Sequence, residues 1–401
     1  MGKEREWRAW PLVATAALGY SASVLHVYAL GPYIQPIQQD FGWTRAQVVS
    51  GITIANVLVA LLCVPLGLVV DRYGPRVVGL VGVALVTCAF ASLGTASGST
   101  GNWIALWSLL AGGALLVQSP VWTRAVASRF LTSRGLAFAL TLSGASVGSA
   151  IFPIMGAWLI ARFGWRMAFL AQGVIWLVLL APILLCWFRE RAPVRASRGV
   201  STTAGVGFAE GLRSPVFLKL LVAGGLFAFC TVGVLVHLVP ILGDAGFAPV
   251  VAAAIASVAG ISAIVGRLLA GVLLDRLPPH LVGAAAFLLA CIAFGLLALP
   301  SGMIGVLVAA ALVGLTLGAE VDVIAYLAAG HFGLKRFASL FGGLVAALAL
   351  GAAFGPLVAG MVFDRGGTYL GFLLGSLVAM LAAALIMVSV GTPRPSAGRD
   401  A

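Results

Sequence analysis

The sequence predicts an all-α membrane protein with twelve transmembrane helices arranged as two bundles of six. Of its 401 residues, 61% are hydrophobic and only 9% are charged, whereas soluble domains carry roughly a quarter charged residues. Crossing the hydrocarbon layer of a bilayer takes about 20 apolar helical residues, and runs of that length recur along the whole chain. A polar stretch at residues 189–215 separates the first six runs from the last six.

The twelve runs are continuously apolar, which favours helices, because the strands of a membrane barrel alternate in polarity over segments of about 10 residues. In the first half they cover residues 11–34, 47–70, 77–96, 103–123, 136–161 and 167–188. In the second half they cover residues 216–242, 250–274, 281–299, 303–328, 337–363 and 369–390. We therefore expect a bundle at residues 1–188, a cytoplasmic linker at 189–215 and a second bundle at 216–401.

The positions of the basic residues predict the orientation, because Lys and Arg favour cytoplasmic loops. With the N-terminus inside, 19 of the 24 basic residues lie in inside segments and Arg267 lies within a span. The four in outside segments are Arg45, Arg162, Arg166 and Arg365. We expect a multi-pass protein of the plasma (inner) membrane with both termini in the cytoplasm, acting as a monomer in the lipid bilayer.

Other classes of protein fit the sequence poorly. The net charge of +12 is spread over many short segments without aromatic residues between them, so no nucleic-acid surface is predicted. No cluster of nucleophile, base and orienting group is evident, and no ATP-binding G-x-x-x-x-G-K-[ST] signature occurs. No metal or other cofactor is expected, since the cysteines all fall within apolar runs and lack C-x-x-C spacing. They are Cys63, Cys88, Cys186, Cys230 and Cys291.

A charged motif near the end of the second run is repeated in the second half. GLVVDRYGPR at residues 67–76 shares its glycine, aspartate and arginine with GVLLDR at residues 271–276, at an offset of 204. Pro153 with Gly156 in the fifth run corresponds to Pro356 with Gly360 in the eleventh. An offset of this length indicates that the two halves are structural repeats.

The pattern G-x-x-x-D-R-x-G-x-R between the second and third helices of a six-plus-six chain resembles the major facilitator superfamily. That resemblance implies secondary transport by alternating access, with a substrate site near the bilayer midplane. A narrower resemblance is to the monocarboxylate and oxalate:formate porters. It rests on FGWTRAQV (41–48), SRGLAFALTLSGASVG (133–148), HLVPILGDAG (237–246), GRLLAGVLLDR (266–276) and GAEVDVIAYLA (318–328).

The repeated motif supplies the candidate gating residues. Glycines let backbones approach and turn, and Asp71 is an anion suited to a helix N-terminus or an arginine on the cytoplasmic face. The resemblance implies that this loop helps to hold an outward-open state. Alternatively, the arginines only enforce topology. The candidates are Gly67, Asp71, Arg72, Gly74 and Arg76, with Asp275 and Arg276 in the second copy.

Three charged residues, Arg267, Glu320 and Asp322, lie inside predicted spans and away from their ends, where each costs roughly 3 kcal/mol unless it is paired or faces water. Arg267 is interpreted as a forked ligand for a substrate carboxylate, as a permanent ion-pair partner, or as a side chain that reaches the inner surface. Glu320 and Asp322 are the candidate proton-coupling residues. They point about 200° apart on a helix, so only one is expected to face the pathway, and the sequence leaves open which.

Further polar side chains in the spans are candidates for substrate binding, although each is equally suited to bonding a neighbouring helix. They are His26, Tyr28, Asn56, Gln118, His237 and Tyr326. No charged residue occurs between residues 338 and 361, where oxalate-type relatives carry a basic one, so a monoanion fits better than a dianion. Ala263 occupies the position at which the vertebrate monocarboxylate porters carry an acidic residue. The resemblance to those porters therefore does not imply proton coupling through this position.

Together these observations predict a secondary active transporter of a small organic monoanion, with protons as a candidate coupling ion. Two alternatives stay open. One is an exporter of lipophilic or drug-like compounds, and the other is a transporter-like sensor that does not transport, which the short predicted tails disfavour.

Overall fold

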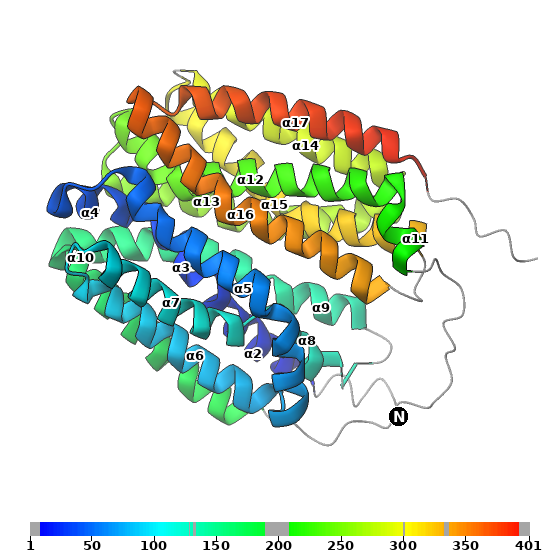
Figure 1. The fold of residues 1–401 in the computed structure, drawn as a ribbon, viewed down its shortest axis with the longest axis horizontal. Coiled ribbons are helices and arrows are strands. Elements are labelled where there is room, and N and C mark those ends of the chain that lie inside the picture. The colour runs from blue at the N-terminus through cyan, green and yellow to red at the C-terminus, as the bar shows by residue number, and fades with distance from the viewer. Residues whose placement is uncertain are drawn as a thin grey trace, which may run out of the picture. The chain divides into compact units, whose positions relative to one another are not determined.

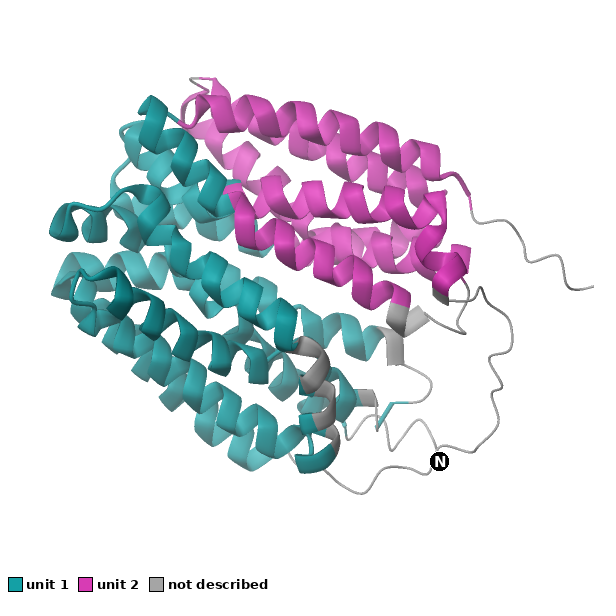
Figure 2. Ribbon diagram, in the orientation of Figure 1, with its two compact units in different colours: residues 1–197, 234–261, 356–368 teal, residues 198–233, 262–355, 369–401 magenta. Residues whose placement is uncertain are grey.

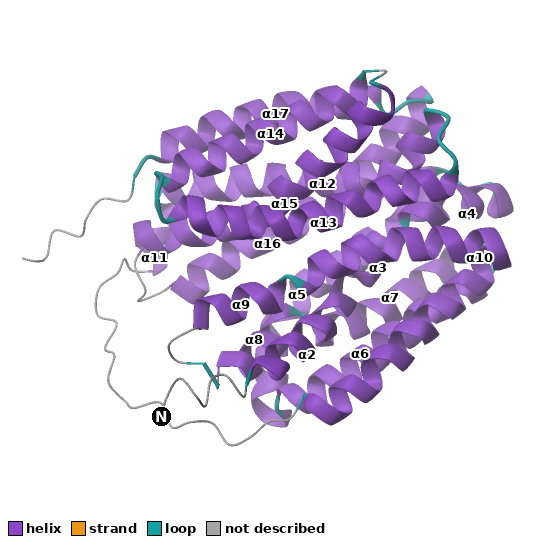
Figure 3. Ribbon diagram, turned by 180° about the vertical axis from the view of Figure 1, so that it is seen from behind, coloured by secondary structure: helices purple, strands orange, loops and turns teal. Residues whose placement is uncertain are grey.

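The computed structural model describes residues 9–127, 129–130, 134–188, 208–299, 301–332 and 337–392. Within these residues every regular element is a helix (Figure 3). Eleven helical segments of the described chain are long and apolar enough to cross a membrane. One of them, Leu136–Trp187, has 52 residues, more than twice the roughly 20 that one crossing requires, and it contains the fifth and sixth predicted runs.

The described residues of the first half form nine α-helices, joined in places by 3-10 turns (Figure 1). They are α2 (Trp10–Ser21), α3 (Leu25–Tyr28), α4 (Ile34–Phe41), α5 (Arg45–Tyr73), α6 (Pro75–Ser92), α7 (Thr100–Leu116), α8 (Ser119–Ala127), α9 (Arg134–Leu142) and α10 (Gly144–Trp187). The second half contains α11 (Phe208–Arg213), α12 (Pro215–Asp244), α13 (Pro249–Leu274), α14 (Pro279–Ala298), α15 (Gly302–Phe332), α16 (Phe337–Gly366) and α17 (Leu370–Val390).

The first predicted helix is broken into three pieces, which the sequence did not predict. A 3-10 turn at Ala22–Val24 separates α2 from α3, and another at Gly31–Tyr33 separates α3 from α4. The Ser23 hydroxyl donates to the carbonyl of Tyr20 at 2.7 Å, and such bonds from serine bend helices. Pro32 lacks an N–H to continue the ladder. The break leaves His26 and Tyr28 on a helix of four residues.

The chain folds back on itself within α10, at Gly164. This glycine has φ 74° and ψ 163°, a conformation that other residues rarely adopt. On the two sides of it, the Gln172 Nε2 donates to the carbonyl of Phe152 at 3.2 Å. A straight helix would separate these residues by about 30 Å. The fifth and sixth predicted helices are therefore two antiparallel parts of α10.

The described chain forms two compact units (Figure 2). Unit 1 comprises Met1–Ser197, Val234–Ile261 and Pro356–Thr368. It thus contains the first-half helices together with the ends of α12, α13 and α16 that are predicted to lie outside the cell. Unit 2 comprises Arg198–Gly233, Ser262–Gly355 and Tyr369–Ala401.

Aromatic side chains fill the core of each unit. In unit 1, Tyr33 stacks on Phe169 with ring centroids 3.9 Å apart, and the Tyr33 hydroxyl donates to the Gln172 amide oxygen at 2.7 Å. In unit 2, Phe227 stacks on Phe287 with centroids 5.1 Å apart, joining α12 to α14. These buried rings hold each unit together by apolar burial and packing.

Candidate functional site

Arg267, in α13, lies beside Asp322 of α15 within unit 2. The Arg267 Nε is 3.6 Å from the Asp322 Oδ2, and the two side chains are 12% and 32% exposed. This separation is too long for a hydrogen bond, so the pair attracts mainly through charge. The sequence leaves open whether Glu320 or Asp322 faces the pathway, and the structure places Asp322 next to Arg267.

The guanidinium of Arg267 retains unused hydrogen-bonding capacity. Its Nε and Nη1 atoms are buried and have no hydrogen-bond partner among the described residues. Guanidinium N–H groups form a rigid fork that matches the two oxygens of a carboxylate. Buried donors without partners are rare and costly, and they mark this point in unit 2 as a place where an anion would be stabilised.

Two glycines bring the backbones of α13 and α15 together at this point. A Cβ added to Gly318 would lie 2.1 Å from the Ala263 carbonyl oxygen and 2.8 Å from the Arg267 nitrogen. A Cβ on Gly266 would lie 2.1 Å from the Leu315 carbonyl oxygen. Any side chain at either position would force the helices apart, so these glycines set the distance between Arg267 and Asp322.

Glu320 points to a different side of α15. Its side chain is buried, and its Oε1 has no hydrogen-bond partner among the described residues. Ile324 lies one turn further along the same face of α15 and packs against Gly224 of α12, where an added Cβ would be 2.8 Å from the Ile324 Cδ1. Asp322, one turn after Gly318, shares the face that contacts α13. Glu320 therefore faces the interior of unit 2, away from Arg267.

Tyr326 lies one turn after Asp322, on the same side of α15, and its side chain is 45% exposed. A phenolic hydroxyl can both donate and accept hydrogen bonds. Among the predicted substrate-binding residues, Tyr326 is thus the one that the structure places on the Arg267 and Asp322 side of unit 2.

The two predicted histidines are buried in unit 1 and contact neighbouring helices. The Nε2 of His26 lies 3.4 Å from the Asn56 Oδ1 of α5, and its ring meets Trp107 edge-on at 6.3 Å between centroids. The Nε2 of His237 lies 2.9 Å from the carbonyl oxygen of Pro356. These contacts match the packing role that the sequence left open for both residues.

The other two predicted polar residues also lie in unit 1. The Gln118 Nε2 donates to the carbonyl of Ala114 at 3.1 Å, which satisfies a backbone group at the break between α7 and α8. Tyr28 is half-buried at the end of α3. Both residues thus belong to unit 1, whereas Arg267 belongs to unit 2.

The predicted cytoplasmic gating residues are described only in part, because the surroundings of Gly67 and the side chain of Asp71 lie outside the described part of the structure. Gly74 joins α5 to α6 at φ 79°, a value that favours glycine. The Arg76 Nη2 donates to the carbonyl of Leu185 at 3.0 Å, linking α6 to the end of α10. Arg72, Asp275 and Arg276 are exposed. The latch role of this motif stays a prediction.

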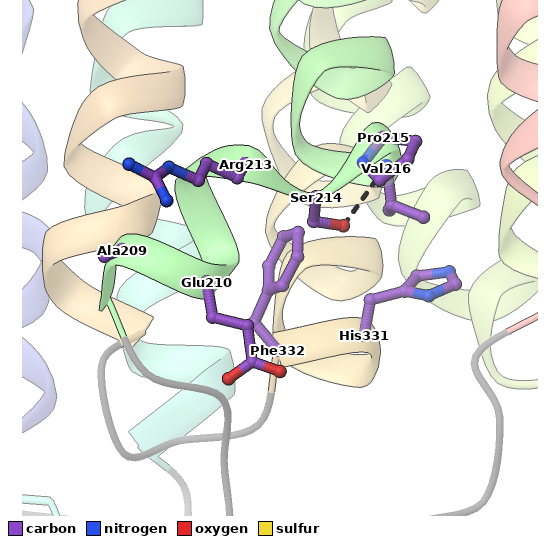
Figure 4. Close-up of a pocket in the computed structure, with 8 residues that line it drawn as sticks. All are labelled: Ala209, Glu210, Arg213, Ser214, Pro215, Val216, His331 and Phe332. Carbon is purple, nitrogen blue, oxygen red and sulfur yellow. Dashed lines mark hydrogen bonds between the residues drawn. The ribbon is translucent and has the colours of Figure 1, made fainter.

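A separate pocket of about 660 Å³ lies beside α11, a short helix that the sequence did not predict (Figure 4). Its charged lining residues do not converge. The guanidinium of Arg213 and the carboxylate of Glu210 point in different directions, and the ring of His331 points away from both (Figure 4). This arrangement does not form a charged binding site.

Comparison with known proteins identifies the family. The sequence model of the Major Facilitator Superfamily matches residues 16–332. The chain is 29% identical to a gallate transporter of Pseudomonas putida over 90% of this chain and 88% of that one. It is 28% identical to the 3-(3-hydroxy-phenyl)propionate transporter of Escherichia coli K12 over 80% and 78%. It is 31% identical to monocarboxylate transporter 13 of Bos taurus over 52% and 47%.

Solved structures show the same fold. The nucleoside transporter NupG superposes with a TM-score of 0.73 at 14% identity, covering 95% of this chain and 99% of that one. A bacterial homologue of the human lysosomal transporter Spinster superposes with a TM-score of 0.69 at 19% identity, covering 96% and 95%. The predicted twelve-helix fold is confirmed. The chain belongs to the major facilitator superfamily and is a multi-pass membrane transporter, not an enzyme.

Proposed function

We propose that this protein is a secondary active transporter that moves a small organic monoanion across the plasma membrane by alternating access. The observation that carries the proposal is the buried Arg267 guanidinium, whose Nε and Nη1 lack hydrogen-bond partners among the described residues. A carboxylate that accepts these two donors would supply the missing bonds. Relatives named as transporters of gallate and of 3-(3-hydroxy-phenyl)propionate support an aromatic or similar organic acid as the substrate.

Charge balance supports a monoanion and assigns a role to Asp322. Without substrate, the positive charge of Arg267 is countered by the carboxylate 3.6 Å away. A bound monoanion would leave two negative charges against one positive charge in a poorly solvated site, which is unfavourable. A proton on Asp322 restores neutrality, whereas a dianion would require a second proton or a second cation. We infer that substrate and one proton enter together, with Asp322 as the proton-coupling residue and not Glu320, which faces away from Arg267.

The other predicted roles fit this scheme. Tyr326 would donate a hydrogen bond to the substrate from the Asp322 side of α15. His26, Tyr28, Asn56, Gln118 and His237 stay predicted substrate-binding residues on unit 1. The orientation with both termini in the cytoplasm and the monomeric state also stay predictions, and they agree with the distribution of basic residues.

The function is tested by uptake into proteoliposomes of a labelled panel of aromatic and aliphatic mono- and dicarboxylates, with and without an inward proton gradient. We expect a monoanion to be taken up and the gradient to stimulate its uptake. Uptake only into liposomes preloaded with an anion would indicate exchange and contradict symport. Failure of every acid in the panel, with the protein correctly inserted, would overturn the proposal.

The roles of the two carboxylates can be separated by comparing Asp322→Asn with Glu320→Gln. We expect Asp322→Asn to lower the rate of proton-driven uptake at least tenfold. Exchange of substrate across the membrane should continue, because the site of the variant stays electrically neutral with a bound monoanion and no proton. Glu320→Gln should keep the dependence on the gradient. The measurement is initial uptake rate against the imposed pH difference. Loss of that dependence in Glu320→Gln alone would reverse the assignment.

A further inference from the structure

Arg45 is a charged residue that is buried near the predicted outer ends of the helices in unit 1. It is the first residue of α5 and is only 4% exposed. Fully buried arginines are rare unless they are paired. The partners of Arg45 include residues of α12 and α16, which are second-half helices, although all the residues concerned belong to unit 1.

The guanidinium of Arg45 is held on three sides. Its Nη1 donates to the Asp244 Oδ2 at 2.7 Å and its Nη2 to the Asp244 Oδ1 at 2.8 Å, which forms a two-pronged pair with the last residue of α12. Its Nε donates to the Gln38 Oε1 at 3.2 Å. The Phe363 ring of α16 lies over the guanidinium, 3.5 Å from the Cζ to the ring centroid. Forked pairs and cation–π contacts are among the stronger polar contacts of arginine.

A second carboxylate binds the backbone at the same turn. The Asp364 Oδ1 accepts from the Arg45 N–H at 2.8 Å, and its Oδ2 accepts from the Ala46 N–H at 2.9 Å. The first N–H groups of a helix lack partners within the helix and carry partial positive charge. The first turn of α5 has no acidic residue of its own. Asp364 therefore supplies this anion from α16, more than 300 residues away in the sequence.

The backbones of first-half and second-half helices are in contact around these charges. A Cβ on Gly360 of α16 would lie 2.8 Å from the Ala46 nitrogen, and a Cβ on Gly260 of α13 would lie 2.2 Å from the Ala150 nitrogen of α10. Two second-half helices, α16 and α13, are thus held against α5 and α10 without intervening side chains.

We propose that Arg45, Asp244 and Asp364 form a reversible latch, named here the outer clamp, which closes the predicted outer side of the transporter. The clamp rests on the proposed alternating access, because opening the outer side must separate α5 from α12 and α16. Its chemistry suits repeated opening. The Arg45 side chain is 5% exposed and the Asp244 side chain is 35% exposed, so separation mainly lets Arg45 regain hydration, which offsets part of the lost attraction. An apolar seal would instead expose its surface to water at each cycle.

The clamp is tested by measuring how often the outer side opens. A single cysteine replaces the buried Val239 near the outer end of α12, in a protein whose native cysteines are replaced by serine or alanine. A membrane-impermeant maleimide added outside then labels this cysteine only when that side opens. We expect Arg45→Gln and Asp244→Asn each to raise the labelling rate about tenfold, equal to about 1.4 kcal/mol in the opening equilibrium. Asp364→Asn should act in the same direction.

The controls separate a latch from a general loss of stability. Asp40→Asn breaks the ion pair between Asp40 and Arg166, which lies at the same end but joins only first-half segments. We expect it to leave the labelling rate unchanged. Asp244→Glu keeps a carboxylate for the fork and should stay within twofold of the parent. All variants are compared by size-exclusion profile, and labelling in urea confirms that the cysteine reacts equally in each.

The outcomes distinguish a failure of the clamp proposal from a failure of the substrate proposal. Unchanged labelling in both Arg45→Gln and Asp244→Asn would overturn the clamp, whatever the transport result. Equal acceleration by Asp40→Asn would also overturn it, because the effect would then be general loosening. Accelerated labelling in the clamp variants alone, with no organic acid transported in proteoliposomes, would support the clamp and reject the substrate proposal.

Discussion

Replacing Arg267 with alanine is expected to lower kcat/KM for uptake of the substrate anion by at least about thirtyfold. The variant removes both the charge and the unpartnered N–H donors, and truncating one member of a buried charged pair costs about 2–5 kcal/mol, or roughly thirty- to several thousand-fold. Arg267→Lys keeps the charge but not the fork, so KM should rise about tenfold with less effect on kcat. Concentration-dependent initial uptake in proteoliposomes measures both constants.

The control for this prediction is Arg162→Ala, which removes an exposed arginine from a predicted outside segment. We expect its kinetics to match the parent. Because Arg267→Ala leaves Asp322 without its partner, the double variant Arg267→Ala with Asp322→Ala tests whether any loss comes from an unpaired carboxylate. Normal uptake kinetics in Arg267→Ala would contradict the assignment of the site. Recovery of uptake in the double variant would also contradict it.

Replacing Gly318 with valine is expected to abolish most transport through displacement of a helix. The new side chain would begin 2.1 Å from the Ala263 carbonyl oxygen, which belongs to the backbone of α13 and cannot rotate away. Overpacking of this kind costs about 1–3 kcal/mol or more. Moving α13 also changes the separation of Arg267 from Asp322. We expect uptake to fall at least tenfold and the Tm in detergent to decrease.

Gly375→Val serves as the matched control, because a Cβ at Gly375 of α17 meets no atom within 4 Å. It makes the same chemical change in an unpacked position of the same half. We expect parental uptake and Tm from it. Equal behaviour of the two variants would show that the contact between α13 and α15 does not control the site.

Much of the fold could be predicted from the sequence, because membrane helices follow a simple physical rule. Backbone groups in hydrocarbon must be satisfied within the segment, so long apolar runs become helices whatever packs beside them. The sequence predicts helices five and six as two separate apolar runs, whereas the helix assignment joins them into one helix, α10, that runs through Gly164. The positive φ of Gly164 and the hydrogen bond between Gln172 and Phe152 show that the chain turns back at this glycine. The breaks around His26 depend on hydrogen bonds from serine that hydropathy does not register.

The candidate site was predicted less completely. Arg267 and the two acidic residues stood out because charge inside an apolar run is expensive. Which carboxylate meets Arg267 depends on the rotation of α15, and that rotation is set by Gly318 against Ala263. Arg45 was noted only as a basic residue in an outside segment. The structure shows that Arg45 is buried and that it binds Asp244, 199 positions further along the chain. No sequence pattern predicts that these two residues pair.

The sequence by itself determined the membrane class, the helical content and the family, because these depend on local hydropathy and short motifs. Only the tertiary structure decided that Asp322 rather than Glu320 faces Arg267, and that Asp244 and Asp364 converge on the first turn of α5. The physical reason is that partner choice among charged side chains depends on how each helix is rotated and how closely it approaches its neighbours. Helix rotation and helix separation are both set by backbone contacts at single glycines, and these contacts join residues too far apart in the sequence for a local pattern to predict them.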